Sequence, residues 1–219
     1  AIVRAGLEED GFRSADPRLR MGDMESDGIY ASIVYGPAAL FGFQIRDPEL
    51  KKLTVEAWND WAAEVFNAYL PDRLSALAFL PTDSPEGAVR ELQRAAAKGH
   101  RGAILNPFEA QIGSRDWDKL WAAAAESGLP ISFHIGGGSR FNPSPGVWEL
   151  PAFAAVAPMQ LDEPLAAMIF SGALERNPEF KLVLAESGVG WIPYLVARMD
   201  DMFEKHAVPW PKTNIHTRP

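Results

Sequence analysis

The sequence contains no cysteine, which excludes a disulfide scaffold, thiolate catalysis and any metal site built from cysteine. Long apolar runs are also lacking, because stretches such as 29–34 and 181–185 are bounded by Gly, Pro or charge well short of a membrane span. Basic residues are outnumbered 29 to 21 by acidic ones and are scattered, which argues against a nucleic-acid partner. From these absences, and because no signal peptide is recognised, we expect a cytoplasmic protein with no membrane or nucleic-acid partner.

Apolar and aromatic residues are abundant by contrast. Hydrophobic residues make up 47% of the chain, and they include seven Trp and twelve Phe. This composition excludes intrinsic disorder, since burial of so much apolar surface offsets the entropy lost on ordering. We therefore expect residues 1–219 to form a single domain with a sizeable core.

Short apolar runs alternate with segments of helical periodicity. The runs are nearly all apolar, as in parallel strands that are covered on both faces, and three of them begin at equal intervals, at Leu74, Gly102 and Pro130. The sequence thus predicts an α/β fold with strands at 28–37, 74–80, 102–107, 131–135 and 181–185, and helices within 50–69, 84–99, 117–128 and 191–202. Ser84, followed by a proline, is the expected N-cap of the second helix.

Two architectures share this pattern. A doubly wound sheet can be complete with five strands, whereas a (βα)₈ barrel needs eight and usually about 250 residues. Periodicity alone does not choose between them. In either fold, the Gly-, Pro- and aromatic-rich insertion at 136–161 follows the carboxyl end of a strand, where active-site loops lie.

Two polar residues at strand ends are candidates for chemistry. His134 lies at the carboxyl end of the strand at 131–135, just before a Gly-rich segment, so its imidazole can ligate a metal; the alternative is a hydrogen-bonded structural histidine. Glu186 directly follows the strand at 181–185 and can bind metal or transfer a proton; the alternative is a partner for an arginine or a helix N-terminus.

Other catalytic motifs fail on spacing. A nucleophile elbow needs glycine at the positions of Ala185 and Val189, and a dinucleotide fingerprint needs glycine at the position of Pro193. His100 precedes a strand, at the end that serves stability in these folds, so we give it no catalytic role.

Three stretches resemble the amidohydrolase-related family that includes α-amino-β-carboxymuconate-ε-semialdehyde decarboxylase and γ-resorcylate decarboxylase. Residues 24–34 resemble that family's entry to its second strand, residues 131–134 its fifth strand, and residues 180–200 its sixth strand and helix. The resemblance implies a (βα)₈ TIM barrel of the metal-dependent hydrolase type, with one divalent metal at the mouth, Zn²⁺ foremost and Mn²⁺ as the alternative.

The resemblance also implies a ligand set that this sequence only partly carries. The family's metal is held by a His-x-His pair from the first strand, a His ending the fifth and an Asp ending the eighth. Only the fifth-strand ligand is matched, by His134, and Glu186 stands where the family commonly has a catalytic His. We therefore expect an incomplete barrel, a piece of a longer protein that supplies five of the eight βα units.

The function implied by the resemblance is metal-dependent, non-oxidative decarboxylation of an aromatic or unsaturated carboxylic acid. His134 is then the metal ligand and Glu186 the catalytic proton-transfer group, while Arg140, Phe141 and Trp148 are expected to bind the substrate. Two alternatives remain open, namely hydrolysis of a lactone, ester or amide, and a non-catalytic barrel that has lost its metal. The family also implies a homodimer.

Overall fold

The computed structural model describes residues 13–36, 45, 47–136, 148–207 and 215–219. Its strands are β1 (Ser32–Val34), β2 (Leu74–Ala76), β3 (Ala78–Phe79), β4 (Ala103–Ile104), β5 (Ile131–His134) and β6 (Leu182–Ala185). The α-helices are α2 (Pro17–Ser26), α4 (Pro48–Trp61), α5 (Pro85–Ala97), α6 (Asp118–Ser127), α7 (Glu149–Val156), α8 (Asp162–Phe170), α9 (Ala173–Arg176) and α10 (Ile192–Met202). The 3₁₀ segments are η1 (Arg13–Ala15), η4 (Arg115–Trp117) and η5 (Ala157–Met159), and the π segments are η3 (Ala62–Asn67) and η6 (Phe203–Ala207).

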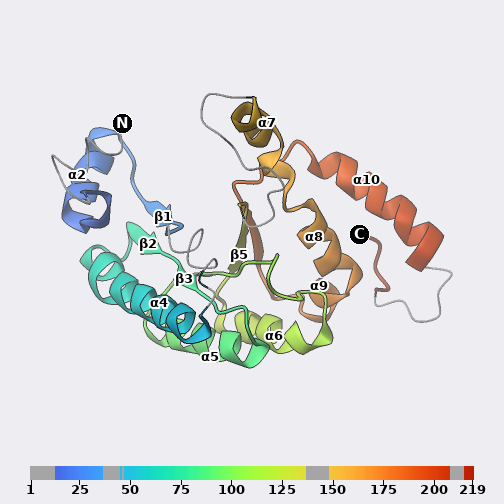
Figure 1. Ribbon diagram of the computed structural model, residues 1–219, viewed down its shortest axis with the longest axis horizontal. Coiled ribbons are helices and arrows are strands. Elements are labelled where there is room, and N and C mark those ends of the chain that lie inside the picture. The colour runs from blue at the N-terminus through green and yellow to red at the C-terminus, as the bar shows by residue number, and fades with distance from the viewer. Residues whose placement is uncertain (1–12, 37–44, 46, 137–147, 208–214) are drawn as a thin grey trace.

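The strands are all parallel and follow one another in sequence order. β1 pairs with β2, and β3, β4, β5 and β6 form a second sheet in that order. A doubly wound sheet reverses its strand order at a switch point, whereas a barrel does not. The observed order therefore selects the barrel architecture, and Figure 1 shows α4, α5, α6 and α8 in an arc outside the strands.

The strand expected at 74–80 is split at Leu77. The backbone N–H of Leu77 donates to Val34 O at 3.0 Å, whereas that of Ala78 donates to Gly102 O at 3.1 Å. The first half of this segment thus belongs to the ladder with β1 and the second half to the ladder with β4. The prediction of one strand was wrong in this detail, because the chain changes partner at Leu77 and so links the two sheets.

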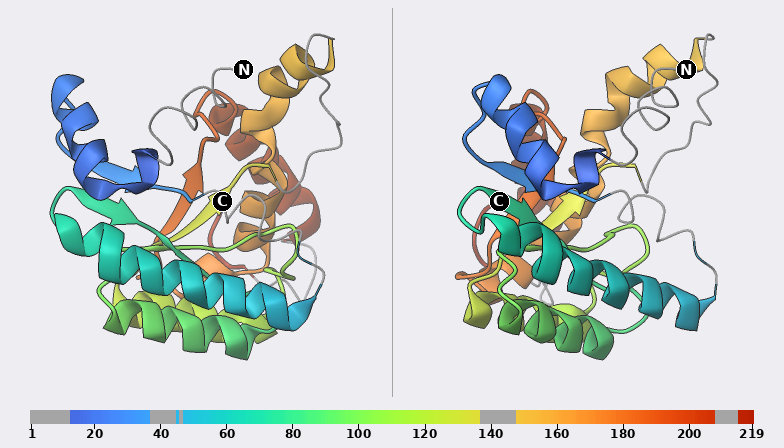
Figure 2. Two further views of the ribbon diagram at one scale, coloured as in Figure 1. Left: turned by 60° about the vertical axis from the view of Figure 1, so that its left-hand side comes forward. Right: turned by 90° about the vertical axis from the view of Figure 1, so that its left-hand side faces the viewer.

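Local capping explains where the helices begin. Asp47 and Ser84 accept hydrogen bonds from Leu50 N and Gly87 N at 2.9 and 3.1 Å, and a proline occupies the first turn of both α4 and α5. The N-cap expected at Ser84 is confirmed. Figure 2 shows α4 and α5 side by side on the same side of the strands.

The main core lies between the strands and the outer helices. Ile131 and Phe133 of β5 are fully buried there, together with Leu120 and Trp121 of α6. Because successive side chains of a strand point to opposite faces, Ser132 and His134 are left for the face away from these helices.

Several helices were not predicted. The insertion expected at 136–161 contains α7, and α2, α8 and α9 also escaped the sequence analysis. The signal in α7 is weak because its sequence, ELPAFAAV, is apolar on nearly every side of the helix and so shows no apolar stripe on a polar background. Among the described residues, no helix combines the length and the apolar character needed to cross a membrane.

Candidate active site

His134 lies at the carboxyl end of β5, on the face opposite the core residues Ile131 and Phe133. Its Nδ1 lies 2.7 Å from Ile135 O. A peptide carbonyl only accepts hydrogen bonds, so Nδ1 carries the hydrogen in this contact and a neutral ring has its free lone pair on Nε2. Metal-binding histidines in proteins are commonly oriented by such a bond from the other ring nitrogen.

Glu186 brings a carboxylate to this imidazole. The register pairs His134 with Ala185, the last residue of β6, so Glu186 is the first residue beyond the ladder. Its φ of 57° is the positive value that a non-glycine residue rarely adopts. Glu186 Oε2 lies 3.5 Å from His134 Nε2, and the glutamate side chain is 64% exposed whereas that of the histidine is 8% exposed.

The two facing atoms of this pair, His134 Nε2 and Glu186 Oε2, can each carry a lone pair. A carboxylate oxygen and an imidazole lone pair both accept hydrogen bonds, so they attract each other only when a proton or a cation lies between them. The pair therefore provides one nitrogen and one oxygen donor that suit a divalent metal such as Zn²⁺ or Mn²⁺. Within the described residues, no group of three or more His, Cys, Asp or Glu side chains gathers around a single point, so this part of the chain provides the pair and no complete metal site.

The expected substrate-binding residues are not brought together by the described structure. Arg140 and Phe141 lie outside the described residues. Trp148 precedes α7 and is 66% exposed. Gly136, two residues after β5, is held near the start of α8 because its N–H donates to Gln160 Oε1 at 2.9 Å.

Two residues that the sequence analysis missed lie at the same strand ends. Tyr35 follows β1, and its ring centroid lies 5.3 Å from that of His134. Asn106 follows β4, and extending the ladder between β4 and β5 places it opposite His134. The rule that singled out His134, a polar side chain at the carboxyl end of a parallel strand, applies equally to both residues.

His100 is buried at the opposite end of the sheet. Its Nδ1 lies 3.2 Å from Ala76 O and its Nε2 lies 3.0 Å from Asn59 O, so both ring nitrogens meet backbone carbonyls. This environment matches the structural role that we expected for His100.

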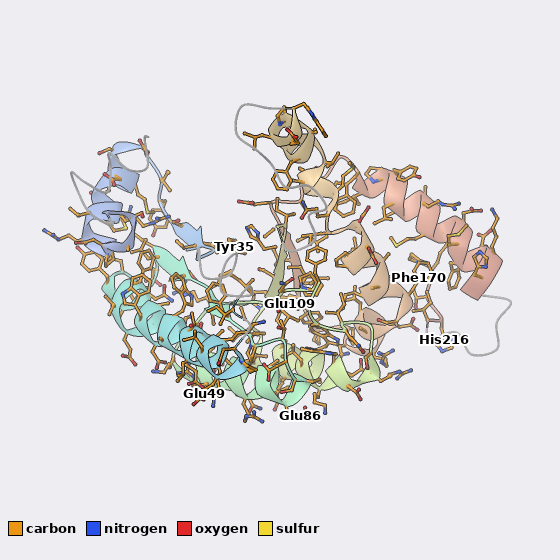
Figure 3. All side chains as sticks on the ribbon, viewed as in Figure 1. Tyr35, Glu49, Glu86, Glu109, Phe170 and His216 are labelled. Carbon is orange, nitrogen blue, oxygen red and sulfur yellow. The ribbon has the colours of Figure 1, made fainter. Side chains whose placement is uncertain are left out.

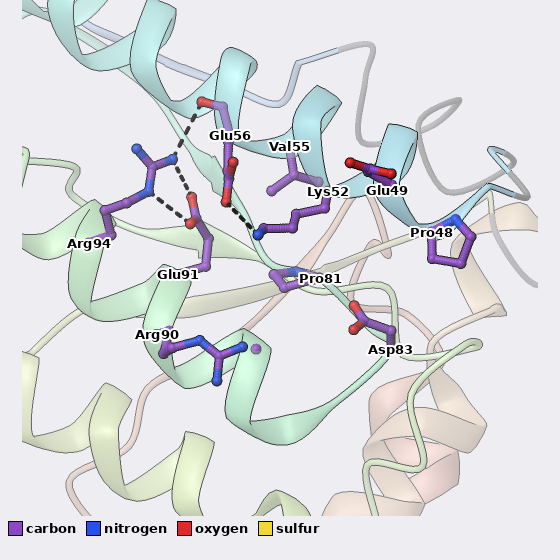
Figure 4. Close-up of a pocket in the computed structure, with 11 residues that line it drawn as sticks. Pro48, Glu49, Lys52, Val55, Glu56, Pro81, Asp83, Arg90, Glu91 and Arg94 are labelled. Carbon is purple, nitrogen blue, oxygen red and sulfur yellow. Dashed lines mark hydrogen bonds and ion pairs between the residues drawn. The ribbon is translucent and has the colours of Figure 1, made fainter.

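A concavity of about 500 Å³ lies between α4 and α5, away from His134 and Glu186 (Figure 4). Its charged side chains are largely paired with each other, as in Arg94 with Glu91 at 2.7 Å and Lys52 with Glu56 at 3.8 Å. The hydrogen bonds that Arg94 donates to Glu91 and to Asp60 raise the pKa of Arg94. None of the candidate site residues lines this concavity, so we interpret it as a groove between two helices rather than an active site.

Comparison with known proteins gives a consistent result. A sequence profile described as amidohydrolase matches residues 8–214. The γ-resorcylate decarboxylase of Polaromonas sp. is 27% identical over 223 residues, which cover 90% of this chain and 61% of that protein. The chain spans about half of the length of other curated relatives that it matches, which include decarboxylases of Emericella nidulans and Dictyostelium discoideum (46% and 52%).

Solved structures show the same fold. An amidohydrolase of Mycobacterium avium subsp. paratuberculosis superposes with a TM-score of 0.73 at 21% identity, over 92% of this chain and 55% of that one. A dihydroxybenzoic acid decarboxylase of Polaromonas sp., solved with bound manganese and the inhibitor 2-nitroresorcinol, superposes with a TM-score of 0.66 at 24% identity, over 91% of this chain and 62% of that one.

Proposed function

The chain belongs to the amidohydrolase family, and from that premise we propose that it carries out metal-dependent, non-oxidative decarboxylation of an aromatic or unsaturated carboxylic acid. The observation that carries the proposal is the pairing of His134 Nε2 with Glu186 Oε2 at the carboxyl ends of adjacent parallel strands. The similarity to a γ-resorcylate decarboxylase supports the choice of reaction and of substrate class.

His134 and Glu186 are the described residues that would hold the metal or act beside it. A divalent metal in this position supplies a Lewis acid that stabilises the negative charge developing as CO₂ leaves. The manganese in the Polaromonas structure supports Mn²⁺, and a nitrogen–oxygen donor pair suits Zn²⁺ equally well. The remaining ligands would come from groups outside this pair.

Glu186 would move the proton that the reaction needs. When the carbon–carbon bond breaks, CO₂ departs without its bonding electrons, and the pair left on the substrate carbon must accept one proton. The exposed Glu186 carboxyl delivers that proton and recovers it from water, so atoms and charge balance without a redox partner. The backbone hydrogen bond of His134 keeps its Nε2 directed at the same point.

The remaining sequence-based assignments complete the proposal. Arg140 would bind the substrate carboxylate with a bidentate guanidinium, and Phe141 and Trp148 would contact the flat face of the substrate. We also propose a homodimer that works in the cytoplasm.

The test is metal-dependent release of CO₂. The protein is stripped with a chelator, reconstituted with Mn²⁺ or Zn²⁺, and assayed against hydroxybenzoates, with lactones, esters and amides in parallel. We expect CO₂ release from at least one hydroxybenzoate only after metal is restored. Hydrolysis of a lactone, ester or amide without CO₂ release would overturn decarboxylation in favour of a hydrolase, and inactivity without metal uptake would indicate a non-catalytic barrel.

A pair of matched substitutions tests the role of Glu186. Glu186→Gln removes the transferable proton while keeping the side-chain shape, so CO₂ release should fall by about 10²–10⁴-fold. Glu126→Gln makes the same change at an exposed position of α6 and should leave the rate unchanged. Equal rates for the two variants would contradict the assignment of Glu186.

A further inference from the structure

Tyr35 reaches across the concave side of the sheet. It follows β1, and in strand order β2, β3 and β4 separate β1 from β5. Nevertheless its hydroxyl lies 3.1 Å from Ser132 Oγ and its ring centroid 5.3 Å from that of His134, both on β5. Figure 3 labels Tyr35 beside β1 on the side that faces β5. One side chain thus connects two strands that share no backbone hydrogen bond.

The two contacts are made to one face of β5. Ser132 and His134 are two residues apart, so their side chains lie next to each other on the same face of the strand. Tyr35 touches the first with its hydroxyl and the second with its ring, which is tilted by 49° to the imidazole. The hydroxyl contact therefore determines where the aromatic ring sits, and the ring occupies space into which the imidazole would otherwise rotate.

Tyr35 is itself held in place. It packs against the cluster of Val55, Leu77, Phe79 and Ile104, together with Trp58. Trp58 is tied in turn, because its Nε1 donates to Leu77 O at 3.0 Å. A ring that is packed on one side and hydrogen-bonded at its tip is a rigid support.

A cavity of about 420 Å³ lies beside this contact, on the side of the amino ends of the strands. Tyr35 and Ser132 line it, together with residues near the amino ends of the strands, such as Arg73, Gly102 and Pro130. His134 does not line it. The Tyr35–Ser132 pair therefore borders this cavity, and the His134 ring lies outside it.

We infer that Tyr35 is a positioning residue, which uses its hydrogen bond to Ser132 to hold the His134 ring so that Nε2 faces Glu186. The inference rests on the proposed function in one respect, which is the expectation that a fixed His134 ring binds metal more tightly. Its structural content, one fixed orientation and tautomer of His134, is independent of metal.

The test uses two conservative variants that remove the same hydrogen bond from opposite sides, Tyr35→Phe and Ser132→Ala. Each should weaken Zn²⁺ or Mn²⁺ binding by about 10-fold, the lower end of the range typical of residues that orient a ligand. The double variant should be no weaker than either single one, because both changes remove one contact. Tyr194→Phe, at a tyrosine that is 74% exposed, is the matched control and should bind metal as the wild type does.

Histidine ¹⁵N NMR of the metal-free protein gives the second readout. The chain has four histidines, so the imidazole signals can be assigned by substitution. In the wild type, His134 Nδ1 should give the signal of a nitrogen that carries hydrogen, as its contact with Ile135 O requires, and in both variants Nδ1 should lose part of that character while the His100 signals stay unchanged. A purely structural role would lower the unfolding temperature without changing the His134 tautomer.

The outcomes separate the two proposals. If the wild type binds no metal but Tyr35→Phe alters the His134 tautomer, the proposed function fails and the positioning role stands. If His134→Ala abolishes metal binding while Tyr35→Phe and Ser132→Ala change neither affinity nor tautomer, the positioning role is overturned and the function stands. Tyr35→Leu, which removes the aromatic ring, should weaken binding at least as much as Tyr35→Phe, and wild-type affinity in that variant would also overturn the inference.

Discussion

Two buried histidines lie at opposite ends of this sheet. His100 precedes β4, is 3% exposed, and has both ring nitrogens within hydrogen-bonding distance of backbone carbonyls. His134 ends β5 and is 9% exposed. Its Nδ1 lies within hydrogen-bonding distance of a backbone carbonyl, whereas its Nε2 faces the Glu186 carboxylate. Burial alone does not distinguish them.

The difference lies in what the second nitrogen meets. At the amino end of the strands, His100 meets two neutral backbone carbonyls, and the ring lies between Ala76 and Asn59 as part of the fold. At the carboxyl end, Nε2 of His134 meets a side-chain carboxylate, which can hold a cation together with the imidazole nitrogen. This agrees with the general division of barrels into a stability face and a catalytic face.

The largest expected difference between the two histidines is in their contribution to metal affinity. His134→Ala removes the nitrogen donor, so Zn²⁺ or Mn²⁺ affinity should fall by more than about 100-fold, beyond the 10–100-fold typical of supporting residues. The free energy of unfolding should change by less than about 1 kcal/mol, since the lost contacts lie at a partly open end. Isothermal titration and urea unfolding measure the two quantities. Unchanged metal affinity would mean that His134 is a structural residue like His100.

His100→Ala should show the opposite pattern. The substitution leaves the carbonyls of Ala76 and Asn59 without their buried partner, which costs about 1–3 kcal/mol in the free energy of unfolding. Metal affinity of the folded protein should be unchanged. His206→Ala, at an exposed histidine, is the control and should change stability by less than about 0.5 kcal/mol. A loss of metal affinity in His100→Ala would erase the distinction between the two ends of the sheet.

The third prediction concerns backbone strain at the carboxyl end of the strands. Glu186 adopts a φ of 57°, which glycine tolerates better than glutamate. Glu186→Gly should therefore raise the free energy of unfolding by up to about 1 kcal/mol while it weakens metal binding. Glu186→Gln keeps the strain and should leave stability close to that of the wild type. A less stable Glu186→Gly variant would show that the strain is not relieved at this position.

The smallest effect concerns the C-terminal segment, remote from both histidines. Glu175 accepts backbone hydrogen bonds from His216 at 2.9 Å and Thr217 at 3.3 Å, and these contacts lower its pKa below the usual 4.5. A lowered native pKa adds stability above the unfolded-state pKa, and that stability is lost as the pH falls through the native value. Glu175→Gln should thus lower stability slightly at neutral pH and flatten its decline in acid, without any change in metal affinity. A urea-unfolding series across acidic pH measures this, and an unchanged slope would contradict the contribution of Glu175.

Much of the fold could be predicted because its signals are local. Alternating apolar runs and helical stripes located all six described strands within five segments, and Ser84 was identified as a cap from its neighbours alone. The division of the segment at 74–80 could not be predicted, since Leu77 changes its ladder partner only when β1 and β4 are both in place. Helix α7 was missed because its sequence is apolar on nearly every side and so lacks the helical stripe that the prediction depends on.

The candidate site could also be predicted in part, again from local signals. His134 and Glu186 were identified as the polar residues that end apolar strands, and the structure places them 3.5 Å apart. Tyr35 and Asn106 were missed although they stand at equivalent strand ends, because an aromatic ring and an amide are less specific signals than an imidazole or a carboxylate.

The sequence by itself determined which segments contain the strands and to which family the chain belongs, because these properties depend on short-range periodicity and residue type. Only the tertiary structure decided that the strands run in barrel order, that Glu186 turns toward His134, and that Tyr35 crosses to β5. These outcomes depend on contacts between residues far apart in the chain, such as Tyr35 and Ser132, which form only when the sheet curves and brings distant strand ends together.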